Sequence, residues 1–149
     1  MKKIILAVMM LIGTSTAFAG DSEPLKAILK AQNYAEAANL VQSTLDQLAG
    51  NEEKAKAYNR LYELAMKKVN YEEGIQLENE TQKQMGKEGN KPVDEKGLYA
   101  AVGAAFNSGV EAIKYDNMPN QKGKVKPKYA ALVESVYKLR NDLINGGVY

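Results

Sequence analysis

The sequence predicts an all-α protein assembled from pairs of helices. Apolar residues recur at spacings of three and four along nearly the whole chain after residue 20, which is the period of an amphipathic helix. No segment alternates β-branched and polar residues as a half-buried strand does. A short stretch, residues 33–37 (Asn-Tyr-Ala-Glu-Ala), also recurs as residues 70–74 (Asn-Tyr-Glu-Glu-Gly), which indicates an internal repeat.

The N-terminus predicts a cleavable secretory signal peptide over residues 1–19. Lys2 and Lys3 form a positive n-region, and an uninterrupted apolar run follows from Ile4 to Ile12. The segment Ala17-Phe18-Ala19 gives the small-x-small pattern of a cleavage site, with Gly20 as the new N-terminus. A membrane anchor is the alternative, but such a run spans about 14 Å as a helix, roughly half of a hydrocarbon core.

Removal of this leader changes the charge of the protein. The chain has 20 Lys and Arg against 18 Asp and Glu, and two of the lysines lie in the leader, so the mature chain is neutral overall. A neutral chain argues against nonspecific binding to nucleic acid or anionic membranes. We therefore expect no nucleic acid among its partners.

The mature chain, residues 20–149, is expected to be one exported helical domain, periplasmic or secreted. The chain has no Cys, which excludes a lipoprotein anchor and disulfide bonds. No later stretch approaches the roughly 20 apolar residues of a transmembrane helix, so we expect no transmembrane segment in the mature chain.

The first helix pair is predicted over about residues 21–50. Ser22 can cap the first helix, and Pro24 lies near its first turn, where a missing N–H costs nothing. Asn33 caps the second helix, and Gly50 ends it in the left-handed conformation. The inward faces carry Leu25, Ile28 and Leu29 on the first helix and Ala37, Ala38, Val41, Leu45 and Leu48 on the second.

The second pair is predicted over about residues 51–86. Asn51 opens the third helix, and Asn70 marks the corner before a fourth helix over about 71–85, which Gly86 closes. The paired acids Glu52/Glu53 and Glu72/Glu73 are expected in the first turns of these helices, where carboxylates favour the helix dipole. The third helix buries Ala55, Tyr58, Leu61, Tyr62, Ala65 and Val69; the polar fourth helix is expected on an exposed flank.

The third pair is predicted over about residues 94–145. A loop at 86–93 precedes the fifth helix near Asp94, a loop over about 116–126 follows it, and the sixth helix starts near Pro127. The fifth helix is expected to bury Leu98, Ala101, Val102, Ala105, Phe106, Val110 and Ile113, and the sixth Tyr129, Leu132, Val133, Val136, Leu139 and Leu143.

The repeat resembles the tetratricopeptide repeat family, whose units are helix pairs of about 34 residues stacked into a solenoid. In each copy an aromatic residue lies at the corner between two helices, followed three positions on by a small residue. The family's first-helix spacing is matched by Tyr99, Val102, Gly103 and Phe106, and its second-helix spacing by Tyr34, Ala37, Val41 and Leu45. Tyr62 and Glu78 depart from the pattern, and an unrelated helical bundle is the alternative.

The resemblance implies a noncatalytic scaffold that binds a protein or peptide in a concave groove lined by the first helix of each pair. Helical phase places Asn59, Glu63, Lys67, Asn107 and Glu111 on that lining. A small-molecule or glycan-binding protein of the cell envelope is the alternative. The sixth helix is too apolar for a terminal cap, so the chain is also expected to be the N-terminal part of a longer repeat protein.

Most catalytic chemistry is absent. Without His or Cys the chain has no nucleophile–base pair of the Ser-His or Cys-His kind and no imidazole or thiolate metal site. The calcium-loop spacing of acids is also missing. We expect neither an enzyme nor a cofactor.

Two weaker signals remain. The second loop carries a lysine at every other position, at Lys122, Lys124, Lys126 and Lys128. One interpretation is a basic finger that binds an acidic partner or a phosphate-rich surface polymer, and the other is a solvated loop kept soluble by its charge. The nine tyrosines suggest an aromatic platform, but their positions at corners and on core faces favour packing.

Overall fold

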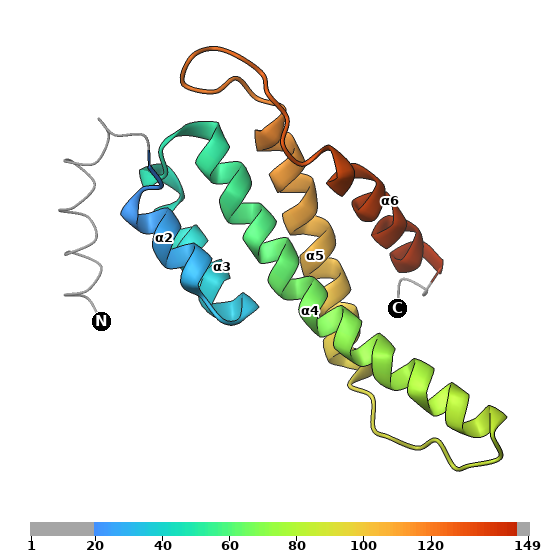
Figure 1. Cartoon of the computed structure of the whole chain (residues 1–149). Coiled ribbons are helices and arrows are strands. Elements are labelled where there is room, and N and C mark those ends of the chain that lie inside the picture. Colours follow the sequence, from blue (N-terminus) through green and yellow to red (C-terminus); the bar gives the residue numbers. More distant parts are fainter. Residues whose placement is uncertain (1–19, 146–149) are drawn as a thin grey trace.

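The computed structural model describes residues 20–145 and confirms the all-α class (Figure 1). No strand occurs within these residues. The predictions for residues 1–19, Ala19 included, and for the tail after Asn145 lie outside the described part. The elements are α2 (Glu23–Lys30), α3 (Tyr34–Thr44), the 3-10 turn η1 (Leu45–Gln47), α4 (Gly50–Gln84), α5 (Glu95–Asp116) and α6 (Ala130–Asn145).

The long helix α4 is the element on which the others assemble (Figure 1). The α2–α3 hairpin packs on its first half, α5 runs back along it in the most extensive helix–helix contact, and α6 packs on α5. One core cluster joins α2 and α3 to α4, and a second joins α4, α5 and α6. Tyr34 packs against both clusters, so this corner aromatic links the two halves of the molecule.

The two predicted caps, Ser22 and Asn33, begin their helices as expected, and Asp94, near which the fifth helix was predicted to begin, is a third cap. The Leu25 N–H donates to Ser22 Oγ (3.4 Å), and the Glu36 N–H donates to Asn33 Oδ1 (2.9 Å). Asp94 Oδ1 likewise accepts the N–H of Gly97 (2.9 Å). Each cap satisfies one backbone donor that the first turn leaves without a partner.

The corner predicted at Asn70 is wrong, because α4 continues through it without interruption. Lys68 Nζ lies 2.6 Å from Glu72 Oε1, an i,i+4 ion pair that spans the expected break. Glu72 therefore lies in the middle of a helix, not in a first turn. The second unit is one 35-residue helix, and the molecule has five helices among the described residues instead of six.

The outer faces of α5 and α6 are less covered than predicted. Val110 and Val133, both expected in the core, are 41% and 47% exposed. The reason is that α6 packs on one side of α5 only, while α4 covers another. The other members of these two stripes are buried or half-buried as expected.

Gly50 has the expected positive φ of 81°, but it starts α4, because α3 already ends at Thr44. Gly103, which matches the small position of the repeat spacing, makes no close helix contact, since a Cβ built there meets nothing within 4 Å. The tight position is Gly109, where a Cβ would collide with Val136 Cγ2 of α6 and lie 3.3 Å from Tyr62 Cδ2 of α4.

Candidate binding groove

A groove of about 400 Å³ opens where α3 and α5 diverge on either side of α4. Its lining is mostly apolar and consists largely of small side chains. The lining residues are Asn33, Tyr34 and Ala35 from α3 and its cap, Leu64, Ala65 and Lys68 from α4, and Ala100, Ala101 and Ala104 from α5.

The groove lies over the seam between the two core clusters. Its floor contains the consecutive residues Leu64 and Ala65; Leu64 belongs to the α2–α3 cluster and Ala65 to the α5–α6 cluster. Tyr34, which contacts both clusters, forms part of one wall. The helices that hold the floor and both walls are thus fixed by the same packing that holds the two halves together.

The only charged residue in the lining, Lys68, is already neutralised. Its ammonium lies 2.6 Å from Glu72 Oε1 and 3.0 Å from Asp94 Oδ2, and Glu72 Oε2 also accepts the N–H of Asp94 (2.9 Å). The hydrogen bond with Glu72 raises the pKa of Lys68, and the same bond lowers the pKa of Glu72. The cation therefore serves the α4–α5 junction, and the groove offers mainly apolar contact.

A stacked aromatic pair fastens α4 to α5 further along. The rings of Tyr58 and Tyr115 lie parallel with centroids 5.8 Å apart, and the ammonium groups of Lys54 and Lys114 approach the Tyr115 ring. Burial raises the pKa of Tyr58, and the negative charge of Glu111 adds to the effect. This tyrosine pair packs as the sequence predicts for tyrosines on core faces.

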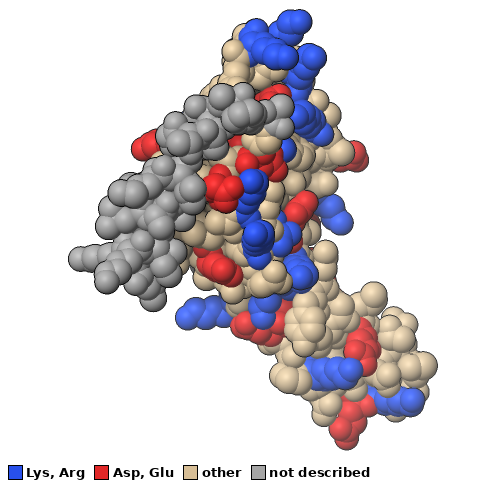
Figure 2. Space-filling view, turned by 60° about the vertical axis from the view of Figure 1, so that its left-hand side comes forward, with Lys and Arg blue, Asp and Glu red and all other residues tan. Residues whose placement is uncertain are grey.

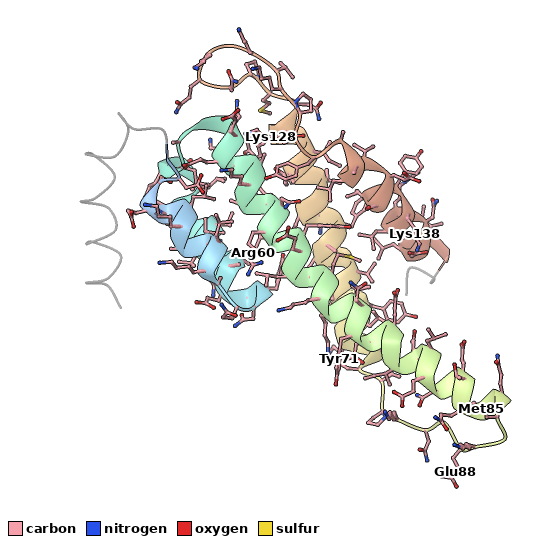
Figure 3. All side chains as sticks on the ribbon, viewed as in Figure 1. Arg60, Tyr71, Met85, Glu88, Lys128 and Lys138 are labelled. Carbon is pink, nitrogen blue, oxygen red and sulfur yellow. The ribbon has the colours of Figure 1, made fainter. Side chains whose placement is uncertain are left out.

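The predicted α4 contact residues lie together, but not in the groove. Asn59 Nδ2 donates to Glu63 Oε1 (3.1 Å), and Glu63 Oε2 lies 3.4 Å from Arg60 Nη1. Arg60, labelled in Figure 3, also donates to the carbonyl oxygen of Ala31 at the end of α2 (3.0 Å). Lys67 is exposed on the same side of the helix.

The two predicted α5 residues are also outside the groove. Asn107 is exposed, and Glu111 lies 3.7 Å from Lys114 on its own helix. The structure therefore does not bring the five candidates into one lining. None of the residues that line the groove was among the predicted contact residues, and the sequence signal that could have found some of them is the run of small residues at 100, 101 and 104 on one face of α5.

A second cavity of about 230 Å³ lies at the far end of α4, between its last turns and the loop at 87–91. Within residues 20–145 no group of three or more Asp and Glu side chains is placed to hold a metal ion. No helix of this part is long and apolar enough to cross a membrane. No family model, curated protein or solved structure matches the chain.

Proposed function

We propose that this protein is a noncatalytic exported scaffold that binds an apolar segment of another protein or peptide in the groove between α3, α4 and α5. The observation that supports this proposal is the groove itself, with its volume of about 400 Å³ and its apolar lining. Complete burial of one Leu or Phe side chain contributes about 1.5–3 kcal/mol. A few such anchors from one partner would therefore supply most of the binding free energy.

The lining favours an apolar peptide over a glycan. Sugar ligands need several free hydrogen-bonding groups, but Lys68 is paired with two carboxylates and Asn33 Oδ1 accepts the N–H of Glu36. The walls of Ala100 and Ala104 carry side chains short enough for a peptide backbone to approach α5 closely. These features match a chain with large apolar side chains better than a polar small molecule.

Export is proposed on the leader sequence and on the position of the first described cap. The signal peptide would be cut between Ala19 and Gly20, and α2 with its cap at Ser22 follows directly. Such a cut removes none of the described helices. Mass spectrometry of the protein recovered from the cell envelope and medium tests this: a chain that begins at Gly20 is expected, and an intact Met1 would contradict it.

The groove is tested by site-specific photocrosslinking in the producing cell. A photoreactive phenylalanine replaces Ala104 in the groove or, as a matched control, the exposed Ala131 on α6. We expect a discrete crosslinked protein, identified by mass spectrometry, at position 104 only. A second photoreactive reporter replaces Ala35 on the α3 wall. Filling the groove with Ala100→Trp and Ala104→Trp should abolish the crosslink that this reporter captures. Equal capture at 104 and 131 would contradict the proposal.

The same reporter separates the groove from the residues chosen by helical phase. Asn59→Ala with Glu63→Ala should leave the crosslink intact, because neither side chain lines the groove. Loss of the crosslink in that double variant would instead assign binding to the outer side of α4. A rise in melting temperature with sugars or metabolites, which we do not expect, would favour the small-molecule alternative.

The relation to tetratricopeptide repeats stays a prediction. The hairpins α2–α3 and α5–α6 are compatible with stacked helix pairs, while the uninterrupted α4 departs from them. The groove proposal does not depend on this relation, since it starts from the described residues alone.

A further inference from the structure

The loop that joins α5 to α6, residues 117–128 (here called the basic loop), concentrates positive charge at one end of the molecule. Lys122, Lys124, Lys126 and Lys128 are all exposed. Lys128 lies 3.7 Å from Glu52, whereas the other three form no ion pair within residues 20–145. Figure 1 shows the loop projecting beyond the helices, and Figure 2 shows basic side chains gathered at the same end, the top of the view.

The basic loop has a defined shape. Asn120 Oδ1 accepts the N–H groups of Lys122 (2.9 Å) and Lys124 (3.0 Å), and the Asn120 N–H donates to the carbonyl oxygen of Lys124 (2.8 Å). Gly123, with φ of 71°, makes the turn between them. A single side chain thus fixes the backbone that carries the two lysines before any ligand arrives, which reduces the entropy lost on binding.

Both ends of the basic loop are fastened to the helical body. At its start, Asn51 Nδ2 donates to the carbonyl oxygen of Pro119 (2.9 Å). At its end, the buried carboxylate of Asp116 accepts the N–H groups of Lys128 (2.8 Å) and Tyr129 (2.9 Å). These bonds also explain why α6 begins at Ala130 and not near Pro127 as the sequence predicted, because residues 128 and 129 are held by Asp116.

The basic loop combines charge with an apolar side chain. Val125 is 51% exposed and lies between Lys124 and Lys126. A soluble polyphosphate would pair with the lysines but has no apolar group to contact the exposed valine. A bilayer with anionic headgroups satisfies both groups, because lysines bind phosphates while an apolar side chain enters the headgroup–acyl boundary.

We propose that the basic loop is a peripheral docking site for an anionic phospholipid surface, with Val125 inserted between headgroups and Lys122, Lys124 and Lys126 on the phosphates. The neutrality of the mature chain argues against nonspecific membrane binding by the chain as a whole, but it does not oppose a local site, because attraction to a surface falls off within a Debye length and depends on the charges nearest to it. The projecting position of the loop brings these lysines to a flat surface first. The site is separate from the groove, and it would hold the groove at a membrane.

Vesicle co-sedimentation tests the proposal with the chain from Gly20 onward, once circular dichroism has shown that this chain is helical and unfolds cooperatively. Binding is expected to vesicles of equal phosphatidylglycerol and phosphatidylcholine and not to phosphatidylcholine alone. The triple variant Lys122→Gln, Lys124→Gln, Lys126→Gln should bind about a hundredfold more weakly. The matched control removes three exposed lysines at the other end of the molecule, Lys83→Gln, Lys87→Gln and Lys96→Gln, and should bind like the wild type.

Insertion is read from a single fluorophore, since the chain contains no Trp. Val125→Trp should shift its emission to the blue with anionic vesicles, and brominated lipid should quench it. Inorganic polyphosphate is the soluble comparison: tight binding to it together with an unshifted emission on vesicles would overturn the membrane assignment in favour of a soluble polyanion. Absence of vesicle binding, or equal losses in the two triple variants, would also overturn the proposal.

Discussion

At the scale of single residues, Gly109 is a position where α5 lies close against both α6 and α4. A methyl group there collides with Val136 Cγ2, and the β-branched valine has little rotamer freedom with which to move away. We expect Gly109→Ala to lower the free energy of unfolding by about 1–3 kcal/mol, measured by urea denaturation.

Gly103 is the matched control for this prediction. It lies in the same helix, and a Cβ there meets nothing within 4 Å. Gly103→Ala should therefore raise stability by about 0.5–1 kcal/mol through helix propensity alone. If the two variants were equally destabilised, the packing of α6 on α5 described above would be wrong.

Glu53 is a second residue on which the fold depends. Its buried carboxylate accepts the Ser22 N–H (2.7 Å), the Ser22 hydroxyl (2.6 Å) and the Ala49 N–H (2.7 Å), so it ties the start of α2 to the start of α4. Glu53→Gln replaces one carboxylate oxygen, an acceptor, by an amide NH₂ group, a donor that would face the N–H and O–H donors of Ser22 and Ala49. We expect a loss of about 1–3 kcal/mol in urea denaturation, whereas the exposed Glu52→Gln should change stability by less than about 0.5 kcal/mol.

Residue types predicted some of these roles and could not predict others. Ser22, Asn33 and Asp94 cap helices because a short polar side chain can reach its own backbone, and such local chemistry is visible in sequence. The role of Gly109 depends on where α6 crosses α5, which no local pattern encodes. The contacts of Glu53 with Ser22 likewise join residues that are distant in the chain.

At the scale of elements, the continuity of α4 gives the sharpest test. A corner at Asn70 would place Tyr71 in a first helical turn, where Pro is tolerated. In an uninterrupted helix, Tyr71→Pro removes a hydrogen bond and costs about 3 kcal/mol or more. Tyr71 is exposed (Figure 3), so Tyr71→Ala is a suitable control with a small effect. If thermal denaturation gave Tyr71→Pro the same melting temperature as the wild type, the helix would end at Asn70 as the sequence predicted.

The junction of α4 and α5 should make stability depend on pH. The hydrogen bond from Lys68 lowers the pKa of Glu72, and the Gly97 N–H, followed by Lys68, lowers the pKa of Asp94. Carboxylates with lowered pKa values contribute stability above their ordinary values of 4.5 and 3.8, and this contribution is lost as the pH falls through the folded-state values. Urea midpoints should therefore fall below about pH 4.5.

Glu72→Gln should flatten this acid-dependent fall in stability, because it removes one of the two carboxylates of this junction whose pKa is lowered. The neighbouring Glu73 is exposed, and Glu73→Gln should keep the wild-type pH dependence. If the urea midpoint fell by the same amount at low pH in Glu72→Gln and in the wild type, Glu72 would not be a source of the pH dependence.

The two Asn-Tyr copies show why element boundaries were only partly predictable. In the first copy, Glu36 Oε2 accepts the N–H of Gln32 (3.1 Å) while Asn33 accepts the N–H of Glu36, and the two bonds end one helix and begin the next. In the second copy, the pair Lys68–Glu72 bridges the same point and favours helix. The same motif thus yields a corner or a continuous helix according to the residues before it.

At the scale of the whole molecule, we expect α4 to join the two larger core clusters into one cooperative unit. Leu64 and Ala65 are consecutive yet belong to different clusters, so neither half can unfold without exposing apolar surface of the other. Leu25→Ala, at a fully buried site in the first cluster, should cost about 2–5 kcal/mol. Circular dichroism and hydrogen exchange in α5 should report the same lowered transition. An unchanged α5 would show two independent units.

The groove is formed by three helices that are brought together only in the folded molecule, and for that reason the sequence did not predict it. Helical phase identified which side of α4 is polar, but not that α3 and α5 diverge over Leu64 and Ala65. The five contact residues were chosen by analogy with a lining of first helices, whereas one wall comes from α3, the second helix of its pair, and other residues of α4 and α5 complete the lining. Only the alanines of α5 form a pattern that is visible in the sequence, as small residues on one face of a predicted helix.

The position of the groove over the seam has a thermodynamic consequence. A ligand bound there contacts α3 and α5 at once and so stabilises the packing of the two halves against each other. Its occupancy would oppose their separation by RT ln(1 + [L]/Kd), about 2.7 kcal/mol at a ligand concentration one hundred times Kd. Protection against amide exchange would rise together in α3 and α5 as the ligand is added. Conversely, a mutation of Tyr34 that weakens the packing between the two core clusters would weaken binding, although every apolar side chain of the partner would still be present.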